Sequence, residues 1–142
     1  SSEARLYSFT PETLNALKKF RLGTSRASKP QAVIYEINKQ TQEIHASPST
    51  DAPRIYTDLS TLASELPPHS PRFVLLSHPI TLKSSGRETA PYVLLYYMPP
   101  TANSELRVLY AGARELMKTT AGVGRVLEVS DEEEVEGVKE VL

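Results

Sequence analysis

The sequence predicts an α/β fold of the α+β kind, with one central mixed β-sheet sandwiched between helices. Short runs rich in β-branched and aromatic residues, at 32–37, 71–80 and 92–98, alternate with amphipathic runs such as 101–121. The run YVLLYYM at 92–98 is apolar almost throughout, which is typical of a central strand covered on both faces. We therefore expect helices on both faces of the sheet.

The N-terminal half is expected to contain two helices and two strands. Thr10 fits the N-cap of the first helix and Pro11 its first position. A strand at 32–37 follows, and then a short polar strand near Ile44. The second helix spans 57–66 and is stopped by two prolines. The first helix is expected to turn three apolar residues inward: Leu14, Leu17 and Phe20.

The C-terminal half begins with a hairpin formed by the runs 71–80 and 92–98, joined by a connection that contains a glycine. The long helix at about 101–121 comes next, followed by a strand at 124–129. A helix ends the chain, and Gly137 should weaken it by about 1 kcal/mol relative to alanine. Its inward residues are expected to be Val135, Val138 and either Val141 or Leu142.

Composition favours a soluble cytoplasmic protein. The 142 residues fit one domain, 1–142, and the net charge of −1 gives no indication of binding to nucleic acid. No run approaches the roughly 20 apolar residues that span a bilayer, and the N-terminus lacks the apolar segment of a signal peptide. Cysteine is absent, so a thiolate metal site is excluded. We expect a monomer with no cofactor, no metal and no stable membrane association.

The long helix carries an unusual line of cations. If Arg107 is placed at zero and the helix turns about 100° per residue, Arg114 and Lys118 lie about 20° to either side of it. Val108 then falls outside the apolar arc and should be exposed, and Ala111 leaves a low gap between the cations. These cations lack the acidic neighbours that usually pair with them four residues away. A solvated helix face and a contact surface for a partner groove are both compatible with this pattern.

Three stretches, at 106–131, 17–23 and 65–78, resemble motifs of glia maturation factors, which belong to the actin-depolymerising-factor homology (ADF/cofilin) superfamily. The run at 106–131 is similar to the end of the family's long helix and the strand after it, including the pair Tyr110-Ala111. Gly112 follows this pair, as in glia maturation factors, where cofilins have serine. The runs LKKFRLG at 17–23 and ELPPHSPRFVLLSH at 65–78 also resemble the family. The resemblance covers about residues 7–130.

This resemblance implies a single ADF-homology domain and a function. Glia maturation factors bind the actin-related protein 2/3 (Arp2/3) complex, inhibit its nucleation of branches and promote debranching, and they bind actin itself poorly. Cofilin-like domains insert the long helix and the N-terminus into a cleft of an actin-like subunit. The implied partner is thus an actin-related subunit of the Arp2/3 complex, and the implied location is the actin-rich cortex or patches.

The resemblance also implies a set of contact residues. Arg107 matches a cation that cofilins use on actin, Val108 matches its apolar neighbour, and Ala111, Arg114 and Lys118 continue the same face. The N-terminal part of this surface would comprise Ser1, Ser2 and Arg5, and a phosphate on either serine would oppose an acidic partner. Glu105 and the absence of consecutive lysines after Ala113 depart from cofilins and favour weak actin binding.

A second surface is implied on the hairpin loop and the last helix, at Lys83, Arg87 and Glu133. In glia maturation factors this surface is thought to contact the first actin of the daughter filament. An ordinary solvated loop and helix cap would explain the same three residues equally well.

Three alternatives remain beside this interpretation. A cofilin that severs filaments is the nearest. Phosphoinositide binding through Lys18, Lys19 and Arg21 is another, although cations at a helix end also complement its dipole. An enzyme is disfavoured, because no phosphate-binding glycine motif follows a strand and the three histidines are scattered. The acids at 131–134 fit the first turn of a helix better than a divalent-ion site.

Overall fold

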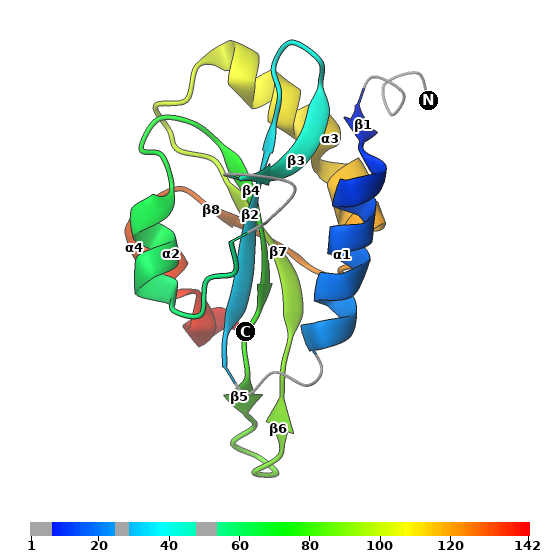
Figure 1. Ribbon diagram of the computed structural model, residues 1–142. Helices are drawn as coiled ribbons and strands as arrows, with labels where there is room; N and C mark the ends of the chain where they lie inside the picture. The colour runs from blue at the N-terminus through cyan, green and yellow to red at the C-terminus, as the bar shows by residue number, and fades with distance from the viewer. Residues whose placement is uncertain (1–6, 25–28, 48–53) are drawn as a thin grey trace.

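A six-stranded mixed sheet forms the centre of the molecule (Figure 1). The computed structural model describes residues 7–24, 29–47 and 54–142. The strands lie in the order β1-β3-β2-β4-β7-β8. Their bounds are β1 Ser8–Phe9, β2 Gln31–Ile37, β3 Glu43–Ser47, β4 Arg72–Ser77, β7 Tyr92–Tyr97 and β8 Val126–Val129. The two edge pairs, β1 with β3 and β7 with β8, are parallel, and the inner pairs are antiparallel.

Helices cover both faces of this sheet, as the apolar run of β7 predicts. Side chains of β4 alternate between the two faces: Phe73 and Leu75 pack with the long helix, whereas Val74 and Leu76 pack with the helices opposite. Figure 1 shows α1 and α3 on one side of the sheet and α2 and α4 on the other. The helices are α1 Pro11–Thr24, α2 Leu59–Glu65, α3 Ser104–Ala121 and α4 Glu132–Glu136, followed by the 3-10 turn η2 Val138–Val141. The predicted fold class is confirmed.

Side-chain caps fix where the helices begin. The amide of Thr13 donates to the Thr10 hydroxyl, as predicted for an N-cap at the start of α1. Asn103 accepts from the amide of Leu106 at 2.8 Å, so α3 starts later than the prediction of about 101. Helix α3 ends at Gly122, whose φ of 73° is the left-handed conformation that favours glycine.

Three features of the predicted fold are corrected by the structure: the inward stripe of α1, the extent of the last helix and the number of short strands. Leu14 is 44% exposed, because the inward stripe of α1 runs instead through Thr13, which is 1% exposed, and the buried Leu17 and Phe20. The last helix stops at Gly137 and continues only as η2. Of the two alternatives for its last inward residue, Leu142 packs on the core and Val141 is 56% exposed. The short strands β1, β5 (Ile80–Thr81) and β6 (Glu88–Thr89) were not predicted.

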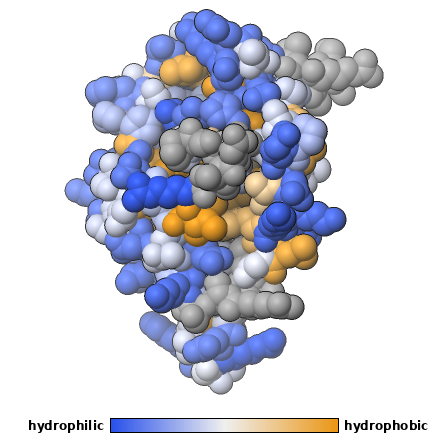
Figure 2. All heavy atoms as spheres, in the orientation of Figure 1, coloured by the Kyte–Doolittle hydropathy of each residue, from blue (hydrophilic) through white to orange (hydrophobic). Residues whose placement is uncertain are grey.

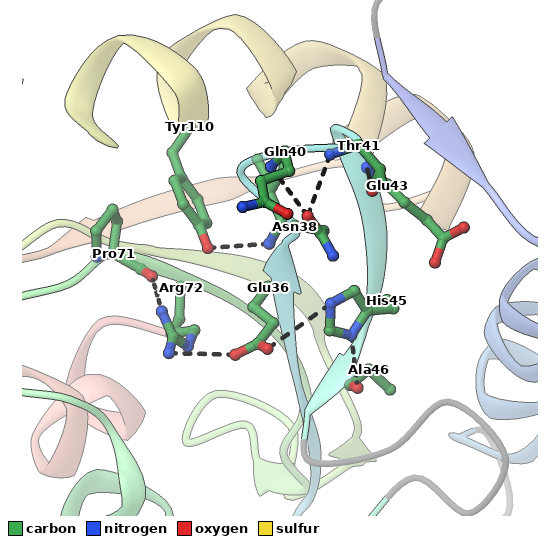
Figure 3. Close-up of polar contacts among 11 residues, drawn as sticks. Glu36, Asn38, Gln40, Thr41, Glu43, His45, Ala46, Pro71, Arg72 and Tyr110 are labelled. Carbon is green, nitrogen blue, oxygen red and sulfur yellow. Dashed lines mark hydrogen bonds and ion pairs between the residues drawn. The ribbon is translucent and has the colours of Figure 1, made fainter. Parts of the chain in front are cut away.

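A buried hydrogen bond joins the long helix to the sheet. The amide of Ile37 donates to the Tyr110 hydroxyl at 2.9 Å, at the end of β2 (Figure 3). Burial raises the pKa of Tyr110 above its ordinary value, so the phenol is neutral and fully available at physiological pH. Beside it, Glu36 lies 3.1 Å from Arg72 and 3.7 Å from His45, which ties β2 to both neighbouring strands (Figure 3).

Replacing Tyr110 with phenylalanine should lower the free energy of unfolding by about 1–3 kcal/mol, because the buried amide of Ile37 loses its partner. Tyr35→Phe is the matched control: Tyr35 is 1% exposed, and its hydroxyl makes no hydrogen bond to any described residue. Denaturant unfolding of both variants measures the difference. Equal losses for the two variants would contradict the role given to the Tyr110 hydroxyl.

The fold should also lose stability at alkaline pH through Tyr92. Burial raises the pKa of Tyr92 to about 12 from 10.0, and its hydroxyl donates to the Ala121 carbonyl at 3.1 Å. The folded state therefore holds this proton more tightly, so its contribution is full below about pH 10 and is lost as pH rises toward 12. Ultraviolet titration of tyrosinate in the wild type and in Tyr92→Phe checks this. A Tyr92 that titrates at its ordinary pKa would contradict the expectation.

Candidate functional site: the exposed face of the long helix

Helix α3 presents one face to the sheet and leaves the other open. Its inward residues pack on the core: Leu109, Tyr110, Ala113, Met117 and Ala121 are buried, and Leu106 and Leu116 pack against them. On the open face Val108 is 72% exposed, which confirms its predicted exposure, and Ala111 and Gly112 are exposed beside it. We call Val108, Ala111 and Gly112 the α3 strip.

Arg107 turns back on the chain. Its Nε donates to the Ala102 carbonyl at 3.1 Å, and its Nη2 lies 3.1 Å from the Pro99 carbonyl and 2.7 Å from that of Pro100. These three carbonyls belong to the turn that connects β7 to α3. Arg107 thus holds the start of α3 in place, a role that the helical wheel does not predict, and much of its donor capacity is already used.

Arg114 and Lys118 gather near the other end of the α3 strip. The Arg114 guanidinium lies 5.0 Å from the centre of the Tyr96 ring, a cation–π distance that holds its charge against the sheet. Together with Ala111, Glu115 and Val126 these two cations line a hollow of about 450 Å³. Glu115 was missed as a member of this site. Among the described residues it forms no ion pair within 4.0 Å, so the hollow contains two cations and one acid.

Glu105, the acid noted in the sequence as a departure from cofilins, is exposed near the start of α3. Its carboxylate lies 3.1 Å from Nζ of Lys39, in the turn between β2 and β3. Because the two side chains are 66% and 53% exposed, this ion pair stabilises the fold by at most about 1 kcal/mol. The main effect of the ion pair is local: Lys39 neutralises the charge of Glu105, the acid one turn before Val108.

Tyr7 borders the strip on the side of Gly112. Its hydroxyl donates to the Leu109 carbonyl at 2.8 Å, which joins the start of the chain to α3. A Cβ atom built on Gly112 would overlap the Tyr7 hydroxyl and lie 3.4 Å from its Cζ, so a larger residue at this position would require the Tyr7 side chain to shift. Glycine inside a helix is less favourable than alanine by about 1 kcal/mol of helix stability. The contact with Tyr7 compensates for this loss.

The structure places the other predicted residues apart from this face. Ser1, Ser2 and Arg5 lie outside the described residues. Lys83 and Arg87 are exposed at the tip of the β5–β6 hairpin, which extends beyond one end of the sheet (Figure 1). Glu133 lies in the first turn of α4, on the opposite face of the sheet from α3. The hairpin and α4 are well separated in Figure 1, so these three residues do not form one compact patch.

The cations of α1 do not form one cluster either. Lys18 and Lys19 are exposed, but Arg21 packs over the C-terminus of α3, where a Cβ on Gly122 would lie 2.6 Å from its Nη1. Lys19 instead borders a hollow of about 500 Å³ between α1 and β2, which Phe20, Val33 and Ile55 also line.

On this side of the molecule the surface is mostly hydrophilic, with small apolar patches beside α1 and near the centre (Figure 2).

Polar clusters elsewhere support the fold. The acidic run in α4 caps its own helix, because Asp131 accepts from the amide of Glu134 and the Glu134 carboxylate accepts from the amide of Ser130. Within residues 7–24, 29–47 and 54–142, no three or more metal-ligating side chains are grouped in a way that suits a metal ion. No helix in these ranges is both long and apolar enough to cross a bilayer.

Comparison with known proteins identifies the family. The model of cofilin/tropomyosin-type actin-binding proteins matches residues 7–141. The chain belongs to this family. Protein AIM7 of Saccharomyces cerevisiae is 39% identical, over 98% of this chain and 97% of its own length. Glia maturation factor of Drosophila melanogaster is 25% identical, over 94% of this chain and 92% of its own length.

Solved structures agree with this assignment. Glia maturation factor from Caenorhabditis elegans superposes with a TM-score of 0.76 at 28% identity, covering 96% of each chain. Streptomyces griseoflavus cofilin, at 16% identity, has a TM-score of 0.70 over 93% of each chain and shows the shared fold. The resemblance to glia maturation factors is thus confirmed, and the protein is related to regulators of actin.

The bonds of Arg107 predict a stability effect that its neighbours on the cation line lack. Arg107→Ala should lower the free energy of unfolding by about 1–2 kcal/mol, because three carbonyls of the β7–α3 turn lose a charged donor. Lys118→Ala, which removes a cation about three turns further along the same helix face without such bonds, should change it by less than about 0.5 kcal/mol. Thermal unfolding of both variants measures this. If Lys118→Ala is as destabilising as Arg107→Ala, the structural role of Arg107 is wrong.

Proposed function

We propose that this protein binds the Arp2/3 complex through the exposed face of α3, inhibits branch nucleation and promotes debranching, with little direct binding to actin. It acts as a non-enzymatic monomer in the cytoplasm, at the actin-rich cortex or patches. A second contact, to the first actin of the daughter filament, extends over two separate positions, the hairpin tip at Lys83 and Arg87 and the start of α4 at Glu133. The support is the family, the relatives named glia maturation factor and the geometry of α3.

The observation that carries this proposal is the exposure of Val108. A β-branched apolar side chain that is 72% exposed on a well-packed helix gains nothing from the fold itself. With the small Ala111 one turn away it forms a low apolar ridge, flanked by Arg114 and Lys118. An amphipathic helix that lays such a ridge into a groove buries apolar area, while the flanking charges orient it.

The three cations have different parts in this mechanism. Within the part of the chain that the structure describes, Arg114 and Lys118 form no ion pair, and both line the hollow beside Ala111, so they supply charge to an acidic groove rim. Arg107 fixes the start of α3 through its carbonyl bonds and offers the partner only its remaining donors. The loss of a rim charge should mainly slow association, whereas the loss of the apolar contact should speed dissociation.

Binding can dissolve a branch only if the protein binds the released or distorted state of the complex more tightly than the intact branch. Weak binding to actin itself follows from two features of α3. Glu105 introduces an acid at the start of the helix, and consecutive lysines are absent after Ala113. Both features reduce the positive charge that this face can offer to an actin filament.

Two assays at matched concentration and salt test the proposal directly. The purified protein is captured with the Arp2/3 complex and, separately, sedimented with bare actin filaments. We expect binding to the complex, shortened branch lifetime and little sedimentation with filaments. Strong sedimentation without binding to the complex would overturn the proposal and indicate a cofilin-type protein that severs or depolymerises filaments.

The contact face has its own test. Val108→Asp should weaken binding to the Arp2/3 complex by tenfold or more, because a carboxylate would enter the apolar contact; a tenfold change corresponds to about 1.4 kcal/mol. Val141→Asp is the matched control, since Val141 is 56% exposed but lies in η2, remote from α3. Similar affinities for the two variants would exclude the α3 face as the contact.

A further inference from the structure

Gly112 is the exposed glycine of α3 whose missing side chain is filled by another part of the chain. It stands one turn after Val108 on the same edge of the helix, since residues four apart stack along a helix. The ring of Tyr7 occupies the space above it, and the Tyr7 hydroxyl donates to the Leu109 carbonyl of the same turn. Tyr7 thereby lies along the edge of the α3 strip opposite to Arg114 and Lys118.

Tyr7 is also held from its other side. The next two residues form β1, which pairs in parallel with β3 through Ser8 opposite Glu43 and Phe9 opposite Ile44. The amide of Ser8 donates to the Gln42 carbonyl at 3.2 Å. With β1 fixed on the sheet edge and the hydroxyl fixed on α3, the ring of Tyr7 has one defined position.

We propose that Gly112 is a positioning residue for the α3 face: it admits Tyr7, and Tyr7 forms the second wall of the strip on which Val108 is the apolar ridge. The partner then meets a ridge with an aromatic wall on one side and two cations on the other. Gly112 itself does not have to touch the partner. This inference rests on the proposed function, because it assigns part of the same contact face.

The proposed role of Gly112 depends on one atom of Tyr7. A methyl group at position 112 would overlap the Tyr7 hydroxyl oxygen, whereas it would lie 3.4 Å from Cζ and 3.6 Å from Cε2, which are ordinary contact distances. The conflict therefore belongs to one oxygen atom. Gly112→Ala should displace the ring of Tyr7, and removing that oxygen with Tyr7→Phe should allow the ring to return.

A mutant cycle of Gly112→Ala and Tyr7→Phe tests this with the full-length chain. We expect Gly112→Ala alone to weaken binding to the Arp2/3 complex about fivefold or more, the effect of one lost ordered contact. In the double variant, binding should recover to the level of Tyr7→Phe alone, because the clash is gone. Gly23→Ala is the matched control: it is a helical glycine with open space around it, and it should bind as the wild type does.

Measurements of folding stability give a second test of this inference that does not need the Arp2/3 complex. Alanine is a better helix former than glycine, so Gly112→Ala in the Tyr7→Phe background should lower the unfolding equilibrium constant about fivefold. In the chain that retains Tyr7, the same substitution should leave the stability of the fold unchanged or lower it. Equal effects of Gly112→Ala on stability in the two backgrounds would overturn the inference.

The outcomes separate this inference from the proposed function. If Val108→Asp weakens binding but Gly112→Ala does not, the positioning role of Gly112 is wrong and the contact face remains. If Gly112→Ala weakens binding and Tyr7→Phe does not restore it, Gly112 does not act through the Tyr7 hydroxyl, and the inference is also wrong. If Val108→Asp binds normally, the proposed face is wrong and the inference falls with it.

Discussion

The constraint on which the rest of the molecule depends is that two adjacent inner strands of its sheet, β4 and β7, are apolar on both faces. Neighbouring side chains of β4 and β7 point to opposite sides, and each side holds buried leucines, valines or aromatic rings. Such strands are stable only when both faces are removed from water. The helix pairs α1–α3 and α2–α4 are the two layers that this requirement demands, and each helix acquires an inner and an outer face as a result.

The outer face of α3 can be used for binding because its inner face is fixed so firmly. The helix is packed along the sheet by Tyr110, Ala113 and Met117, bonded to the end of β2 by the Tyr110 hydroxyl and held at its start by Arg107. A rigid helix can keep an apolar residue such as Val108 in water without collapse around it. Preorganisation of this kind lowers the ordering cost of association, so a small ridge can bind well.

Much of this arrangement could be predicted from the sequence, because it follows from local rules. The apolar runs predicted β4 and β7, the cap residue Thr10 predicted the start of α1, and helical spacing predicted the inward and outward sides of α3. Contacts between distant residues could not be predicted in the same way. The hydroxyl of Tyr7 on Leu109, the return of Arg107 to the Pro100 carbonyl and the two-residue strand β1 depend on how far-separated segments meet. Leu14 was misplaced because a buried Thr13 took the inward position.

The lengths of the outer strands have a further consequence. The sheet ends in β1, which has two residues, on one side and in β8, which has four, on the other. A long exposed edge offers unpaired amides and carbonyls on which another chain can add a strand, and short edges limit this. Within residues 7–24, 29–47 and 54–142, the outermost strands β1 and β8 therefore offer only short backbone edges to which a second copy of the chain could add a strand.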